Sequence, residues 1–198
     1  MKAILISIQP KWVAKILNGE KTIEIRKTMP KCDLPIDVYI YCCKDKLSLT
    51  QYLYKDGWGY DAVPNYNYAK SIGCAKEKLN GKVVAKFTLN KVEEIRYLHC
   101  GNFYHFEYGM ITSKINEYLE PKGYAYAWHI DSLEIFDKPK ELSEFEKVGS
   151  YNNPTIKCKK KERGWCNYGI SPYRGKWVGC EKARLTKAPQ SWCYVEVE

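Results

Sequence analysis

The sequence lacks the short motifs that mark several large enzyme classes. Its 198 residues contain no G-x-S-x-G, H-E-x-x-H, P-loop or G-x-G-x-x-G pattern, so the matching hydrolase, metalloprotease, NTPase and dinucleotide-binding hypotheses lose their main support. The longest apolar runs, Ala3–Ile8 and Val38–Cys43, are much too short for a membrane span. Lys2 opens a strand-like run that breaks at Gln9-Pro10, which is unlike a secretory leader. We therefore expect a cytoplasmic protein with no membrane partner.

Metal-binding patterns are also scarce. The nine cysteines include no C-x-x-C pair, and their odd number and the adjacent Cys42-Cys43 fit a disulfide framework poorly, which predicts reduced thiols. His99, Cys100 and His105 lie in an aromatic-rich stretch that is more typical of core or loop than of a metal site. We predict no metal and no cofactor. The weaker alternative is a zinc site near the C-terminus, formed by Cys158, Cys166, Cys180 and Cys193.

Positive charge is concentrated in the last quarter of the chain. The net charge is +9, yet residues 1–146 carry 21 Lys and Arg against 19 Asp and Glu, whereas residues 147–198 carry 11 against 4. This segment also holds three of the six tryptophans and the run Lys159, Lys160 and Lys161. Cations interleaved with flat rings suit a polyanion, because cations neutralise phosphates while rings stack on bases. The alternative is a solvated basic tail that keeps the protein soluble.

Hydrophobic periodicity predicts an α+β fold with short strands. Pro10 begins a short amphipathic helix that ends before Gly19, and a second helix covers Thr112–Leu119. Such short strands without regular intervening helices favour a curved or closed mixed β-barrel with a few short helices. The expected strands are Ala3–Ile8, Thr22–Arg26, Ile36–Cys43, Lys82–Leu89, Val92–Tyr97, Tyr124–Ile130, Leu133–Phe136 and Trp192–Val197, with a helical turn at Pro139–Phe145. Val92–Tyr97 is expected to extend or pair with Lys82–Leu89.

The chain divides into a body and an appendage. We expect a domain over residues 1–146 with an insertion at about 44–80, where the sequence becomes Tyr-rich and is broken by Gly and Pro. Residues 147–198 form the basic appendage, loop-rich and containing Cys and Trp, whose last strand returns to the body.

The most distinctive local feature is the segment GEKTIEIR, residues 19–26. Because side chains alternate along a strand, Thr22, Glu24 and Arg26 share one face, and Lys21 stands at the start of the strand. A carboxylate and a guanidinium held together in this way present an acceptor and planar donors to one ligand. The alternative is an ordinary surface ion pair.

These residues resemble the signature of the ASCH domain family. The opening AILISIQPKWVAKILNGEKTIEIRK matches its strand, helix and G-x-K-T-x-E-x-R, and the resemblance continues through NGKVVAKFTL, YAYAWHI, PKELSEF and APQSWCYVE. It covers residues 1–43, 80–146 and the final segment, and is similar to small ASCH proteins of phages, prophages and Gram-positive bacteria. It implies a PUA-like β-barrel whose cleft, beside the first helix, is lined by Lys21, Glu24 and Arg26, with Thr22 on the same face.

The resemblance implies RNA-related roles, and the first hypothesis is an RNA- or nucleotide-binding module. The cleft then takes a nucleotide while Lys159, Lys160 and Lys161 follow the RNA backbone. The second hypothesis is an enzyme in which Lys21 and Glu24 are catalytic, either an N4-acylcytidine-type amidohydrolase or a ribonuclease. Amidohydrolase relatives have Thr at the position of Glu24 and need a further downstream Glu, for which Glu107, Glu117 and Glu120 are candidates. A third hypothesis is a phage protein-interaction factor that acts through its tail.

Overall fold

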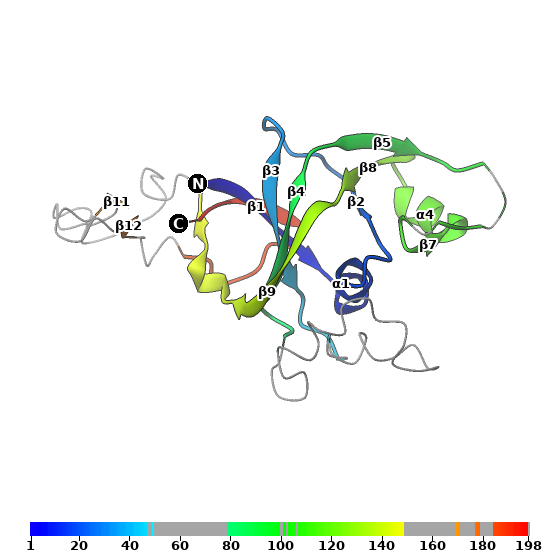
Figure 1. Cartoon of the computed structure of the whole chain (residues 1–198). Helices are drawn as coiled ribbons and strands as arrows, with labels where there is room; N and C mark the ends of the chain where they lie inside the picture. The colour runs from blue at the N-terminus through cyan, green and yellow to red at the C-terminus, as the bar shows by residue number, and fades with distance from the viewer. Residues whose placement is uncertain are drawn as a thin grey trace.

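A sheet of six strands, called the longer sheet below, runs through the centre of the molecule (Figure 1). A computed structural model describes residues 1–46, 49, 79–99, 101, 103–105, 107–148, 169–170, 177–178 and 184–197. Within the sheet, β1 and β3 are parallel and the other neighbours are antiparallel. Its strand order is β10 (Glu146–Lys147), β13 (Trp192–Glu196), β1 (Lys2–Ile8), β3 (Ile36–Cys42), β4 (Val83–Leu89) and β9 (Asp131–Lys140).

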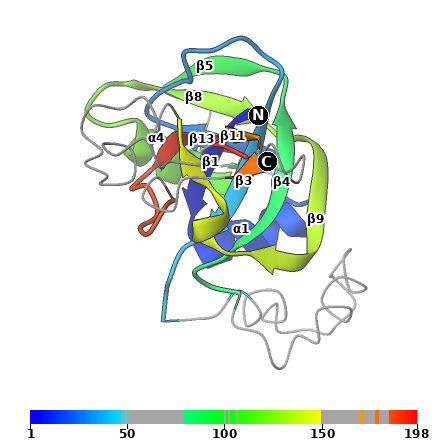
Figure 2. The same cartoon turned by 90° about the vertical axis from the view of Figure 1, so that its left-hand side faces the viewer.

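A second sheet of three strands lies beside the first. Its order is β2 (Ile23–Arg26), β8 (Tyr124–His129) and β5 (Val92–Arg96), all antiparallel, so β2 and β5 are edge strands. The helix α4 (Thr112–Leu119) packs on its outer side, where Ile115 and Leu119 contact Ile25 and Ala125. Figure 2 shows β5 and β8 crossing above the strands of the longer sheet.

The short elements complete the described chain. The hairpin of β6 (Tyr104–His105) and β7 (Met110–Ile111) precedes α4, and a single 3-10 turn covers Leu142–Glu144. Two further short strands, β11 (Gly169–Ile170) and β12 (Trp177–Val178), pair with each other. None of the described helices is long and apolar enough to cross a membrane.

The strand β1 is buried on both faces, which explains its unbroken apolar run. Ile4, Ile6 and Ile8 pack against the helix α1 (Pro10–Leu17), while Ala3 and Leu5 face a second apolar cluster on the other side. Trp128 of β8 is fully buried in the first cluster. The side chains of β1 therefore hold α1 on one face of the longer sheet.

The structure confirms the α+β class, and it corrects details of the predicted elements. Val92–Tyr97, expected to extend or pair with the preceding strand, instead gives β5, which pairs with β8 in the second sheet. The helical turn expected at Pro139–Phe145 is shorter, because β9 continues to Lys140. The described strands form separate sheets, and their pairing does not close a barrel. The predicted insertion and most of the basic appendage lie outside the described residues.

Candidate functional site

The turn after α1 places Lys21 at the start of β2. Gly19 has a φ of +75°, a left-handed conformation that costs glycine nothing. The chain then folds back, so that the amides of Glu20 and Lys21 donate to the Lys15 carbonyl at 2.9 and 3.0 Å. These hydrogen bonds to the end of α1 therefore fix the backbone position of Lys21.

Lys21 is buried, and its ammonium group is surrounded by acceptors. Nζ donates to the carbonyl oxygens of Ile23 at 2.5 Å and Tyr108 at 3.0 Å, and lies 3.4 Å from Oε2 of Glu24. Gly109 follows Tyr108 with a φ of +65°, a left-handed conformation that favours glycine. Burial lowers the pKa of Lys21, more than the Glu24 carboxylate raises it.

Glu24 joins Lys21 to Arg26. Its Oε1 lies 2.9 Å from Nη2 of Arg26, and Nη2 also donates to the Ser7 carbonyl of β1 at 2.8 Å. Nη1 donates to the Ser191 hydroxyl at 3.3 Å, whereas Nε of Arg26 is buried without a hydrogen-bond partner in the described chain. Two buried cations therefore share one buried carboxylate.

The burial of Glu24 and Arg26 follows from the pairing of the second sheet. Glu24 lies opposite Trp128, and residues opposite each other in an antiparallel pair share a face. Trp128 belongs to the core of the longer sheet, so this face of β2 is turned toward β1. The ion pair expected from strand parity is present, and because β2 is buried at all four positions, it is not an ordinary surface ion pair.

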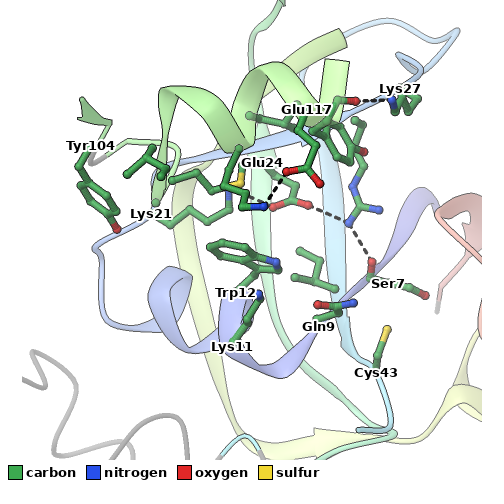
Figure 3. A pocket seen from close by; sticks show the side chains of 18 of the residues that line it. Ser7, Gln9, Lys11, Trp12, Lys21, Glu24, Lys27, Cys43, Tyr104 and Glu117 are labelled. Atoms are coloured by element: carbon green, nitrogen blue, oxygen red, sulfur yellow. Dashed lines mark hydrogen bonds and ion pairs between the residues drawn. The ribbon is translucent and has the colours of Figure 1, made fainter. Parts of the chain in front are cut away.

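The three charged side chains line an open cavity of about 890 Å³ (Figure 3). Its walls come from the N-terminal half of α1, the strand β2, the β6–β7 hairpin and α4. Five cations, Lys11, Lys21, Arg26, Lys27 and Lys114, line it against two carboxylates, Glu24 and Glu117. Rings of Trp12, Tyr104 and Tyr118 lie among them. A polar ligand with negative charge and a flat group suits this lining.

The predicted site residues are only partly brought together. Lys21, Glu24 and Arg26 meet in the cavity, whereas Thr22 is exposed and does not line it. Of the three candidate downstream glutamates, Glu117 lines the cavity, and Glu107 and Glu120 do not. Lys159, Lys160, Lys161, Cys158, Cys166 and Cys180 lie outside the described residues.

No described residues form a metal site. Cys193 is half-buried and belongs to β13, and His105 contacts the Thr112 hydroxyl at 3.0 Å. Among the described residues, no group of three or more His, Cys, Asp or Glu side chains is placed to hold a metal ion.

Several cavity residues carry no functional signal in the sequence. Trp12 reads as part of the apolar face of α1, yet it lines the cavity and Nζ of Lys11 lies 4.5 Å from its ring centre. Ser7 and Cys43 read as parts of apolar strands, yet both line the cavity. Burial raises the pKa of the Cys43 thiol, against the opposing effect of Arg26. Only the pairing of β1 with β3 places Ser7 and Cys43 together.

A comparison with known proteins finds solved structures that are similar to this chain. No protein-family model and no curated protein matches the chain. The chain is similar to ASCH from Zymomonas mobilis, with a TM-score of 0.47 and 14% identity over 91% of this chain and 90% of that chain. A point mutant of ASCH from the same organism gives the same score and identity over 92% and 94%.

Proposed function

We propose that the chain is an ASCH-type protein with a PUA-like fold that binds RNA or a nucleotide. The observation that carries this proposal is the buried Lys21, Glu24 and Arg26 cluster, which opens into a cavity with an excess of three positive charges among its lining residues. The volume of about 890 Å³ lies in the range of cavities that enclose small ligands. The cavity then holds one nucleotide unit.

Each charged residue has a distinct task in this proposal. Glu24 accepts a hydrogen bond from an exocyclic amine, as carboxylates do from cytosine N4. Lys21 already donates to two carbonyls and contacts Glu24, so it fixes the carboxylate. Arg26 lines the cavity, and its guanidinium is the kind of planar donor that suits a ligand oxygen.

The cavity rim supplies the remaining contacts. Lys11 and Lys114 are exposed there and are suited to a phosphate, which for Lys114 competes with the Glu117 carboxylate 2.6 Å away. Trp12 and Tyr118 offer rings on which a base stacks.

The first experiment measures binding of cytidine monophosphate and short single-stranded RNA as a function of salt. We expect affinity that falls steeply with salt, because each phosphate contact contributes about 0.7 to the slope of log K against log salt. Replacing Lys11→Gln and Lys114→Gln together reduces the RNA slope by about 1.4 on this basis. The charge-matched control, Lys91→Gln with Lys122→Gln, alters exposed lysines outside the cavity. An affinity that does not change with salt concentration, or no binding in about 50 mM salt, contradicts the proposal.

Hydrolysis is a second candidate function, and the environment of Lys21 favours it. A lysine whose pKa is lowered by burial is closer to the neutral amine that acts as a base or nucleophile, and Glu117 at the rim adds a carboxylate. The experiment incubates the protein with N4-acylcytidines and single-stranded RNA. Turnover that is lost in Lys21→Ala and Glu24→Gln supports an enzyme. Measurable binding without turnover supports the binding module.

A further inference from the structure

A second cavity of about 650 Å³ adjoins the first. It lies around the ends of β1 and β3 and beside the segment that leads to β13. Its lining includes Ser7, Cys43, Lys44, Glu141 and Lys187. Two of them, Ser7 and Cys43, also line the first cavity.

Ser7 and Cys43 line both cavities, and Figure 3 shows them at the edge of the first. They are held at adjacent strand ends, since the Cys43 amide donates to the Ile8 carbonyl at 2.8 Å. The Ser7 carbonyl accepts from Arg26 at 2.8 Å in the first cavity, and the Ser7 hydroxyl donates to the Pro189 carbonyl at 2.7 Å in the wall of the second. Ser7 therefore forms hydrogen bonds with a lining residue of each cavity.

One segment of chain also runs along both cavities. Gln190 lines the first, whereas the residues before it, Leu185 to Pro189, line the second. Leu185 is buried in the core and anchors this wall. The two cavities thus share two lining residues and one continuous segment of chain.

The second cavity offers positive charge without obvious counter-ions. Lys44 and Lys187 are exposed at its lining and form no ion pair with another described residue. The carboxylate in the lining, Glu141, is paired with Lys82 at 3.1 Å. Two lysines that keep their charge free are suited to phosphate oxygens.

We infer that the two cavities form one track for a single-stranded oligonucleotide. The first cavity holds one nucleotide, the strand passes over Ser7 and Cys43, and the phosphate of the adjoining nucleotide meets Lys44 and Lys187. This inference rests on the proposed function and adds that the ligand is a strand of more than one nucleotide.

The test compares cytidine monophosphate with a cytidine trinucleotide across a salt series, in the wild-type protein and in the Lys44→Gln and Lys187→Gln double variant. We expect the trinucleotide to bind more tightly than the monophosphate. The double variant should lower the trinucleotide slope of log K against log salt by about 0.7, for one phosphate that is no longer neutralised, and leave the monophosphate slope unchanged. The Lys91→Gln and Lys122→Gln variant controls for the loss of two charges.

The outcomes separate the two proposals. If the monophosphate binds and the trinucleotide binds no more tightly, the track is wrong and the nucleotide cavity stands. An equal effect of the double variant and the control also overturns the track. If neither ligand binds, the proposed function fails, and the track fails with it.

Discussion

At the scale of the residue, Lys21 is held in a balance between burial and attraction. Loss of water favours the neutral amine, and the Glu24 carboxylate favours the ammonium group. Burial is the larger effect, so the pKa of Lys21 in the folded chain lies below its ordinary value of 10.5. At a pH between the folded and the ordinary pKa, the unfolded chain binds a proton that the folded chain does not.

This difference predicts how stability changes with pH. Because the unfolded state then binds more protons, the contribution of Lys21 to the free energy of unfolding rises with pH up to about 10.5. The contribution of one group rises by at most about 1.4 kcal/mol per pH unit. Urea unfolding of the wild-type protein and of Lys21→Met at several alkaline pH values isolates the contribution of Lys21 to the free energy of unfolding. The wild-type value minus the variant value should rise with pH, and a flat or falling difference contradicts a lowered pKa.

Strand parity in the sequence was enough to find Glu24 and Arg26 as a pair, because alternation is a local property. It also placed Thr22 with them, yet Thr22 precedes β2 and is exposed. Ser7 and Cys43 were not predictable as site residues. Their place depends on the pairing of distant strands, which no local pattern encodes.

At the scale of the element, the sequence contains the same pattern twice in one sheet. Glu24 and Arg26 of β2 are 2.9 Å apart, and so are Glu94 and Arg96 of β5. Arg26 and Glu94 both lie opposite Tyr126, so the two pairs share a face. The two pairs differ in solvent exposure. The side chains of Glu24 and Arg26 are 10% or less exposed, whereas those of Glu94 and Arg96 are 41% and 80% exposed.

This natural comparison predicts very different costs for the same substitution. Glu24→Gln leaves two buried cations without their carboxylate and should lower the free energy of unfolding by about 3–5 kcal/mol. Glu94→Gln breaks an exposed pair and should cost about 0–1 kcal/mol. Urea unfolding at neutral pH measures both. Similar costs for the two variants contradict the role assigned to the buried cluster.

The same comparison shows the limit of sequence reading for elements. Short segments of alternating pattern predicted the strands, whose positions are largely confirmed. The pattern E-x-R did not reveal which pair is buried, because burial comes from the face that β2 turns toward β1. For the same reason, β5 was expected beside β4 and lies beside β8.

At the scale of the whole molecule, positive charge has two locations with separate tasks under the proposed function. The cavity residues contact one or two nucleotides, and their charge lies in the described body of the chain. Lys159, Lys160 and Lys161 belong to the segment that holds most of the net charge of +9. If this segment follows the backbone of a longer RNA, its charge matters only for ligands that extend beyond the cavities.

Ligand length therefore separates the two contributions. Replacing Lys159, Lys160 and Lys161 by Gln should reduce the slope of log K against log salt by up to about 2 for a long single-stranded RNA, at about 0.7 per contact, and leave cytidine monophosphate unaffected. The control replaces Lys91, Lys122 and Lys138, three exposed lysines outside both cavities, and removes the same charge. An equal loss in both triple variants indicates a general effect of net charge, because a long-range field does not depend on which lysines supply it. A loss confined to the first variant assigns the appendage to the RNA backbone.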